Sequence, residues 1–190
     1  MPGFLGLTAF YSLSLFTFSG IWVPRWSLSR GFDSVLNDVI ATGCDHCFVQ
    51  VFALGESYCP SRYAPYHNLF SSDDLRRFLQ NAHRHNIKVH AWFNLFYIAS
   101  YNNPPVDPGH PFNCRPDWFV WDYHGQSILG FSASEIKRLG LEGYYLAPAN
   151  YWVREYLKSI ILEVITNFDF DGVHLDYVRY PSKEFTLDPA

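Results

Sequence analysis

The chain has 190 residues, enough for one domain with a hydrophobic core of its own. Apolar residues make up 48% and charged residues 17%, a balance that excludes a disordered or fibrous protein. The net charge is −4 and the lysines and arginines form no basic run, so nucleic acid is not expected as a partner. Aromatic residues reach 19%; such rings stack on sugars and bases but also fill cores, and composition leaves both uses open.

An uncharged apolar run from Phe4 to Phe18 is too short for a transmembrane helix, but it has the length of the apolar segment of a signal peptide. No lysine or arginine precedes it, and Ser19-Gly20 is its only candidate end. We expect residues 1–19 to be a signal or anchor segment, with the protein in the periplasm, in the cell envelope or secreted. The alternatives are a leading strand or a misplaced start codon, with a cytoplasmic location.

Strand and helix patterns alternate along the rest of the chain. Gly43 is a natural helix end, Ser71 with Asp74 matches a capping box, and Pro181 ends the last strand because proline cannot donate to a ladder. The expected elements are strand 21–26, helix 30–42, strand 47–53, loop 54–70, helix 71–86, a strand within 87–98, loop 99–150, helix 151–167 and strand 171–181. Within the long loop, residues 134–139 could form a short helix.

The helix expected over 151–167 has a clear buried stripe at helical spacing. Its members are Val153, Leu157, Ile160, Val164 and Phe168, with Arg154, Glu155, Lys158 and Glu163 lying away from it. Four alternations of strand and helix indicate right-handed βαβ units and a parallel sheet. The fold class is therefore α/β.

The last strand, residues 171–181, combines apolar residues with chemical groups. Since side chains alternate between the faces of a strand, Val173, Leu175 and Tyr177 should share one face and His174 and Asp176 the other. For Asp171 we prefer a structural role in a turn to a role in the site.

Polar residues also occur in the other strands, which should be nearly all apolar if they are buried in a parallel sheet. They are Arg25, Gln50, His90, Trp92 and Asn94, in addition to His174 and Asp176. Each could be a satisfied interior group, an interpretation favoured for His90 or Gln50 alone. Burying a charged group such as Asp176 costs free energy unless the group has a partner or a functional role, so we interpret Asp176 as functional.

Cys44 and Cys47 have a spacing found in zinc and redox sites, yet the expected strand places them on opposite faces. We predict buried structural thiols, with zinc or a disulfide as alternatives. His83 and His85 fall in the last turn of a helix, where cations are favoured, and are expected to be surface residues rather than metal ligands.

Six stretches together resemble the glycosyl-hydrolase-like family 10 proteins, which are bacterial β/α barrels. They are residues 20–23, 49–52, 90–94, His110-Pro111 with 116–118, 153–156 and 171–181. The resemblance implies a TIM (β/α)8-type barrel, here about its first four βα units over residues 20–190, that is, the N-terminal half. It also implies hydrolysis of glycosidic bonds in a polysaccharide or oligosaccharide, with bacterial cell-wall glycan as a substrate for some relatives. No cofactor and no metal are expected.

A more distant resemblance, to the fourth strand of α-amylases, suggests a role for Asp176. Those enzymes have a Gly-x-Arg-x-Asp pattern that ends in the nucleophile, whereas Gly172 to Asp176 here has His174 in the place of the arginine. Asp176 is the catalytic candidate. Because His174 replaces the arginine of the pattern, whether Asp176 acts as the nucleophile stays open. Expected substrate-binding residues are Arg25, Gln50, His90, Trp92, Asn94, His174, Arg179 and Tyr180, with Trp22, Trp26, Trp92, Trp118 and Trp121 as stacking platforms or core residues.

Glycoside hydrolysis generally needs two carboxyl groups, and only Asp176 stands out. The acids at positions 56, 107, 117, 122 and 184 are expected to be solvated loop residues. We therefore expect this chain alone to lack hydrolase activity and its open sheet edges to favour self-association. Two alternatives stay open: a non-catalytic carbohydrate-binding remnant, and a metal-dependent hydrolase that uses His90, His174 and Asp176 as ligands.

Overall fold

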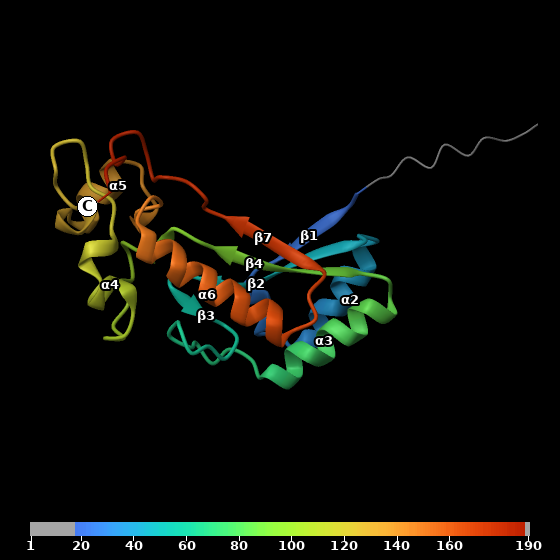
Figure 1. Cartoon of the computed structure of the whole chain (residues 1–190). Coiled ribbons are helices and arrows are strands. Elements are labelled where there is room, and N and C mark those ends of the chain that lie inside the picture. The colour runs from blue at the N-terminus through green and yellow to red at the C-terminus, as the bar shows by residue number, and fades with distance from the viewer. Residues whose placement is uncertain (1–17, 189–190) are drawn as a thin grey trace, which may run out of the picture.

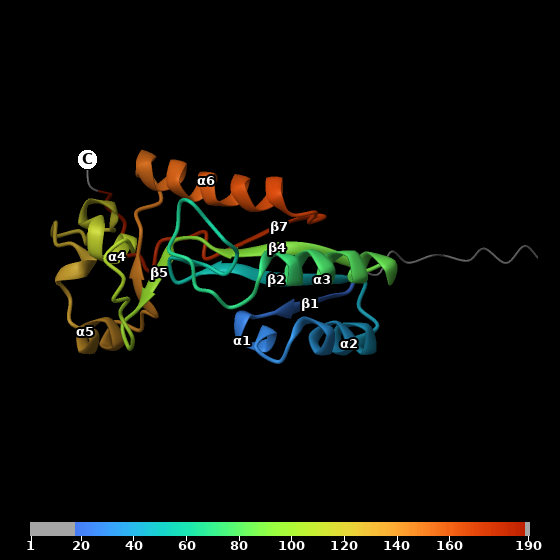
Figure 2. The same cartoon turned by 90° about the horizontal axis from the view of Figure 1, so that it is seen from below.

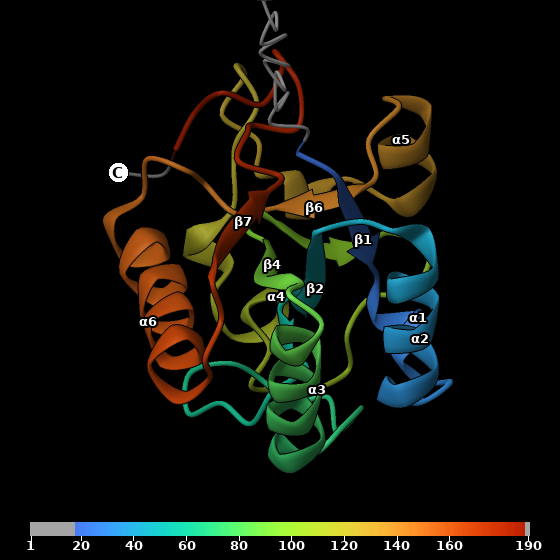
Figure 3. The same cartoon turned by 90° about the vertical axis from the view of Figure 1, so that its right-hand side faces the viewer.

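Four parallel strands form the centre of the fold in the computed structural model, which describes residues 18–188 (Figure 1). They are β1 (Gly20–Val23), β2 (His46–Ala53), β4 (Lys88–Asn94) and β7 (Gly172–Asp176), in the spatial order β1-β2-β4-β7. The short β3 (Glu56–Ser57) pairs antiparallel with β2. Seen end-on, the strands form an arc with helices on its convex side (Figure 3). The predicted parallel α/β sheet of four βα units is confirmed.

The helices on the convex side of the sheet are α1 (Arg25–Leu28), α2 (Phe32–Thr42), α3 (Ser72–Arg84) and α6 (Tyr151–Asn167). Seen from below, α6 flanks one end of the sheet and α1 with α2 the other (Figure 2). The core lies between these layers, where Val89, Ala91 and Phe93 of β4 are fully buried. The opposite, concave face of the sheet holds the polar side chains.

The helix ends agree with the predicted signals. Gly43 ends α2 with a left-handed φ of 71°, which glycine adopts without a steric penalty. The Ser71 hydroxyl accepts from the Asp74 N–H in a complete capping box, and Asn86 follows α3 with a φ of 57°. The predicted bounds and buried stripe of α6 are both confirmed.

The predicted first strand is too long, because β1 ends at Val23 and Arg25 with Trp26 belong to α1. Pro24 lies between them with an extended backbone, at φ −71° and ψ 154°. Since proline has no N–H to donate, the ladder stops there and the next residue begins a helix. Arg25 therefore reaches the sheet from a helix start rather than from a strand.

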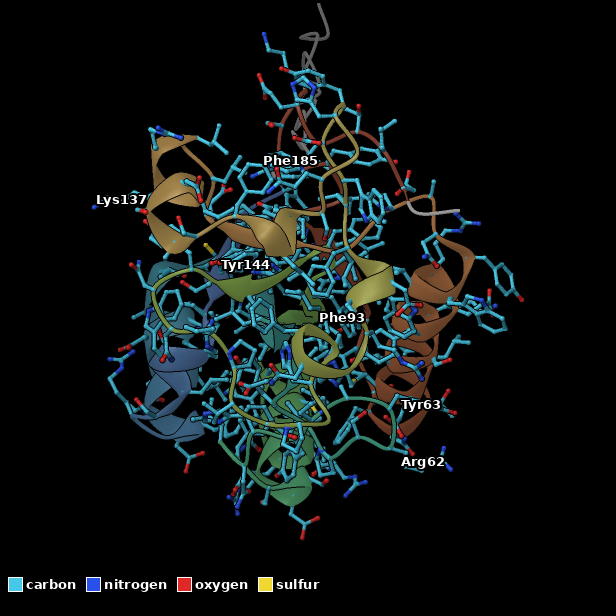
Figure 4. All side chains as sticks on the ribbon, turned by 90° about the vertical axis from the view of Figure 1, so that its left-hand side faces the viewer. Arg62, Tyr63, Phe93, Lys137, Tyr144 and Phe185 are labelled. Carbon is cyan, nitrogen blue, oxygen red and sulfur yellow. The ribbon has the colours of Figure 1, made fainter. Side chains whose placement is uncertain are left out.

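The stretch predicted as a loop over 99–150 is a folded insertion. It contains α4 (Pro111–Cys114), α5 (Ala133–Arg138), two short 3-10 turns, and the strand β6 (Gly143–Tyr145), which pairs with β5 (Tyr97–Ser100). Residues 182–188 bind this insertion: Trp121 and Leu187 exchange two backbone hydrogen bonds, and Phe185 is buried. Figure 4 shows Tyr144 and Phe185 among the insertion's side chains, at the end of the sheet where β4 and β7 finish.

The last strand differs from the prediction in two ways. It ends at Asp176 rather than continuing to residue 181, and Tyr177 takes a left-handed φ of 54°. The Val173 and Leu175 side chains face away from His174, as the alternation predicts, and both are 43% exposed. The edges of β1 and β7 have no strand partner among residues 18–188. Self-association through these edges stays a prediction.

Several acids and histidines are less exposed than predicted because the fold gives them partners. Asp122 is buried and accepts from the backbone N–H groups of His124 and Gln126. His83 Nε2 donates to the Asp171 carboxylate, with 2.9 Å between Nε2 and Oδ2, so neither is a simple surface or turn residue.

All four cysteines are free. The prediction of buried thiols holds for Cys47, whose burial raises the pKa of the thiol to about 12, but Cys44 is half-buried. Among the described helices, none is long and apolar enough to cross a membrane. Residues 1–17 lie outside the described part, so the signal segment stays a prediction.

Glu163 is the clearest departure from the predicted helix faces, because its side chain is only 5% exposed. Its carboxylate accepts from the Ser61 hydroxyl at 2.6 Å and from the backbone N–H and Nε–H of Arg62. These bonds fasten the loop after β3 to α6. Figure 4 shows Arg62 and Tyr63 beside this helix at the surface.

We expect Glu163→Gln to lower the free energy of unfolding by about 2 kcal/mol, because an amide group would face donors that now bind a buried carboxylate. The measurement is urea denaturation at neutral pH. Glu155→Gln on the same helix is the control, since Glu155 pairs with Lys158 in solvent and should contribute less than about 0.5 kcal/mol. Equal losses at both positions would contradict the anchoring role of Glu163.

Candidate active site

A pocket of about 420 Å³ lies where the parallel strands end, on the concave side of the sheet. Active sites of β/α barrels lie at this end of the strands. Five predicted site residues meet in it, namely Arg25, Gln50, Trp92, Asn94 and Asp176. The remaining lining residues are Trp26, Leu54, Tyr97, Ser100 and Tyr177.

Asp176 is held by one hydrogen bond on each carboxylate oxygen. Trp92 Nε1 donates to Oδ2 at 3.2 Å, and the backbone N–H of Tyr177 donates to Oδ1 at 2.7 Å. The left-handed φ of Tyr177 turns the chain out of the strand at this point, so Tyr177 lines the pocket instead of joining the face of Leu175. The carboxylate is thus oriented by a neighbouring strand and by its own following residue.

Arg25 and Gln50 form a unit on the opposite side of the pocket. Gln50 is 2% exposed, and its Oε1 accepts from both the backbone N–H and the guanidinium of Arg25, at 3.2 and 3.4 Å. The guanidinium carbon lies 5.5 Å from the ring centres of Trp26 and Tyr58. Arg25 makes no ion pair within residues 18–188, so its remaining N–H groups are free for a ligand. Gln50 orients Arg25 through these contacts.

The aromatic wall beside Asp176 was not predicted as a unit. Tyr97 and Tyr177 have ring centres 5.0 Å apart, and Tyr145 packs on both. Arg179 covers Tyr145 and Tyr177 and pairs with Glu142 at 2.8 Å, so it takes part in the wall, and its contact with a ligand stays a prediction. The period-two pattern could not reveal this wall, because Tyr145 belongs to the insertion and Tyr97 lies on β5, which pairs with β6 of the insertion.

Tyr180 also lies outside the pocket, since its hydroxyl donates to Asp188 at 2.5 Å. Among the predicted stacking platforms, Trp26 is 64% exposed at the pocket and Trp92 lies within it. Trp118 is buried and Trp121 is half-buried in the insertion, whereas Trp22 is 53% exposed on the concave face of the sheet.

His90 and His174 lie on the concave face but do not line the pocket. His46 Nδ1 and His90 Nε2 share a hydrogen bond of 2.7 Å with their rings stacked, and Trp22 Nε1 donates to His174 Nε2 at 3.2 Å. Burial lowers the pKa of His90, and the neighbouring His46 lowers it further. Both histidines therefore have partners within the sheet, and their contacts with a ligand stay a prediction.

The residues that the structure describes contain no group of three or more His, Cys, Asp or Glu side chains that could hold a metal ion. The ligand set of the metal-dependent alternative, His90 and His174 with Asp176, is thus not assembled. Each of the three has a different partner, respectively His46, Trp22 and Trp92.

The model of the family described as "Glycosyl hydrolase-like 10" matches residues 29–190. The chain belongs to this family. The match covers five of the six sequence stretches, all but residues 20–23, and the family resemblance is thereby confirmed.

The chain is also similar in sequence to a curated relative that is much longer. The chain is 26% identical over 177 residues to "Glycosyl hydrolase YngK" of Bacillus subtilis, which covers 85% of this chain and 31% of the relative. The chain therefore spans about a third of that relative's length, and the activity of the whole relative is not established for it.

Solved structures support the barrel fold. A hypothetical protein from Ruminiclostridium thermocellum superposes with a TM-score of 0.64 at 17% identity, covering 89% of this chain and 82% of that one. An α-L-fucosidase from Paenibacillus thiaminolyticus gives a TM-score of 0.61 at 16% identity, over 84% of this chain and 23% of the enzyme. The four βα units thus have the fold of most of the first structure and of part of the second, that of a TIM-type barrel.

Hydrolysis by a family member would need a second carboxyl group beside Asp176. Asp176 is the only acid that lines the pocket within residues 18–188. Glu142 stands behind the wall, where burial would raise the pKa of its carboxyl, but hydrogen bonds from Tyr145 and Arg179 outweigh burial and lower it. An ionised, paired Glu142 is not suited to donate a proton.

The lowered pKa of His90 predicts how stability depends on pH. Below the ordinary histidine pKa of 6.5 the unfolded chain takes up a proton that folded His90 resists, so the free energy of unfolding falls as the pH decreases from 6.5. The charged neighbours act in both directions, since Asp171 raises the pKa of His90 whereas His46, His174 and Lys88 lower it.

We expect His90→Gln to flatten the dependence of urea-denaturation stability on pH between neutral and mildly acidic conditions. His85→Gln is the control, because His85 is exposed at the end of α3. An unchanged pH dependence in His90→Gln would show that another group is responsible.

Proposed function

We propose that this chain binds a polysaccharide in the Asp176 pocket and contributes one of the two carboxylates of a glycoside hydrolase site. The observation that supports this most directly is the arrangement of Asp176. It lies at a strand end, and a hydrogen bond to each of its carboxylate oxygens fixes its orientation. The pocket around it is lined by aromatic side chains and by the guanidinium of Arg25. Family membership supplies the reaction class.

The pocket suits a neutral, hydroxyl-rich ring. Trp26, Tyr97 and Tyr177 offer aromatic surface for the apolar face of a sugar, and Arg25 offers donors for hydroxyl oxygens. Asp176 balances the charge of Arg25 across the pocket. We propose cell-wall glycan, a β-1,4-linked amino-sugar polymer, as the substrate class.

The proposed role of Asp176 is that of nucleophile or electrostatic partner to the anomeric carbon. Its oxygens accept hydrogen bonds from Trp92 and the Tyr177 backbone, and both bonds fix the orientation of the carboxylate in the pocket, as such a role requires. Because no second acid lines the pocket in the described part of the chain, we propose that these 190 residues bind sugar without cleaving it. A carbohydrate-binding module is the second candidate, and the same observation favours it.

We expect the purified protein to bind chitotetraose and to release no shorter sugars from it or from cell-wall glycan strands. Trp26→Ala should weaken binding about fivefold through lost ring stacking. Calorimetry measures the binding and chromatography the products. Trp152→Ala is the matched control, because Trp152 is also 64% exposed but lies on α6, outside the pocket.

Three outcomes would count against these proposals. Absence of binding to any oligosaccharide would contradict the proposed pocket, as would equal effects of Trp26→Ala and Trp152→Ala. Product release that disappears in Asp176→Asn would contradict the proposal that these residues only bind, and would establish Asp176 as catalytic.

A further inference from the structure

Tyr177 follows Asp176 in a backbone conformation that tyrosine rarely adopts. Its φ is 54°, in the left-handed region that residues with a Cβ avoid. In this turn the Tyr177 N–H points back at Oδ1 of Asp176, 2.7 Å away. An unfavourable backbone conformation persists only where the surrounding structure enforces it. The contacts that hold the Tyr177 side chain therefore also determine how the Asp176 carboxylate is oriented.

Three side chains pack on the Tyr177 ring. The ring centres of Tyr97 and Tyr145 lie 5.0 and 6.2 Å from its own. The guanidinium carbon of Arg179 lies 5.2 Å from the ring centre of Tyr177 and 5.6 Å from that of Tyr145. A guanidinium group is attracted by the negative face of an aromatic ring. Arg179 thus links the turn after β7 to β6 of the insertion.

Glu142, the residue before β6, holds the Arg179 side chain in this place. Its Oε1 accepts from Arg179 Nη2 at 2.8 Å, and its Oε2 accepts from the Tyr145 hydroxyl at 2.9 Å. One carboxylate therefore binds both the cation and one of the two rings that the cation covers. The Arg179 and Glu142 side chains are 47% and 41% exposed, so solvent screens the pair and its contribution to stability is small. We expect its main effect on the position of the Tyr177 ring.

We propose that Arg179 is a positioning residue that acts on Asp176 through Tyr177. It holds the Tyr177 ring beside Tyr145, and this keeps the left-handed turn and the hydrogen bond to Asp176 Oδ1. Through Glu142, the insertion thus regulates the orientation of the carboxylate. Arg179 does not belong to the lining of the pocket, which agrees with an indirect role. The importance of this orientation for sugar binding rests on the proposed function of the pocket.

The indole N–H of Trp92 reports on Asp176, because it donates to Oδ2 of that carboxylate. In NMR spectra of the sugar-free protein, with the indole signal assigned by Trp92→Phe, we expect Arg179→Gln and Glu142→Gln to move this signal upfield, as a weaker hydrogen bond does. Arg30→Gln is the matched control, because Arg30 forms an ion pair of the same 2.8 Å length, is 55% exposed and lies outside the pocket. It should leave the Trp92 signal in place.

The effect on the ligand is measured by calorimetry with chitotetraose. Arg179→Gln and Glu142→Gln should bind it about threefold more weakly, the scale of a half-exposed ion pair with its ring contacts. Tyr177→Gly removes the ring but leaves the left-handed turn accessible, so in that background Arg179→Gln should change neither the Trp92 signal nor the affinity any further. The urea midpoints of Arg179→Gln and Arg30→Gln should be equal.

The outcomes separate a positioning role from its alternatives. An unmoved Trp92 signal in Arg179→Gln would overturn the proposal, and so would a urea midpoint lowered in Arg179→Gln alone, which would indicate a structural role. A threefold loss of affinity that persists in the Tyr177→Gly background would overturn it in favour of direct contact between Arg179 and the sugar. Absence of chitotetraose binding by the wild type would contradict the proposed function only, because the Trp92 signal of the sugar-free protein still tests Arg179.

Discussion

The position of Asp176 depends on the register between β4 and β7, and that register is fixed at the other end of the two strands. There the Asp171 carboxylate accepts from the Val89 N–H at 2.8 Å, from Lys88 at 3.1 Å, and shares a hydrogen bond with His83. The backbone N–H of Asp171 donates to the Val89 carbonyl. A slip of one residue would send every side chain of β7 to the opposite face. Asp171 therefore determines on which side of the sheet Asp176 lies, although it takes no part in the pocket.

The same strand pair shows why a side chain is absent at Gly172. A Cβ there would lie 2.7 Å from Nδ1 of His90, the residue that faces it in the register. Glycine lets the His90 ring lie against the backbone and stack on His46 and Phe48. This stack fills the concave face below the pocket, so the pocket is confined to the strand ends. Packing at the lower half of the sheet thus limits where a ligand can reach.

The sequence predicts the parts of this site that follow from local periodicity. Gln50, Trp92, Asn94 and Asp176 alternate with apolar residues, so their shared face follows from the two-residue period of a strand. Tyr177 breaks that period through its left-handed φ, and nothing in its residue type announces such a conformation. Tyr145, Glu142 and the partners of Glu163 come from segments distant in sequence, and their contacts depend on how the insertion and the loop after β3 pack. Helical spacing could place Glu163 on α6 but could not show what covers it.

The two ends of the sheet differ in how fully their polar groups are satisfied. At the N-terminal ends of β4 and β7, Asp171 has three partners, and the His46 and His90 rings share a hydrogen bond. At the other end, the buried Asn94 oxygen is unpartnered, Arg25 has no counter-ion within residues 18–188, and Tyr177 holds a strained backbone. Unpaired polar groups and strained backbone raise the free energy of the folded state, so they persist only where the surrounding structure enforces them. They are found mainly at functional sites. The hydrogen-bonded N-terminal ends of β4 and β7 hold the two strands in place, so the polar groups at the other end can stay unpaired and available to a ligand. This division supports the proposed function of the pocket by an argument that does not use the family match.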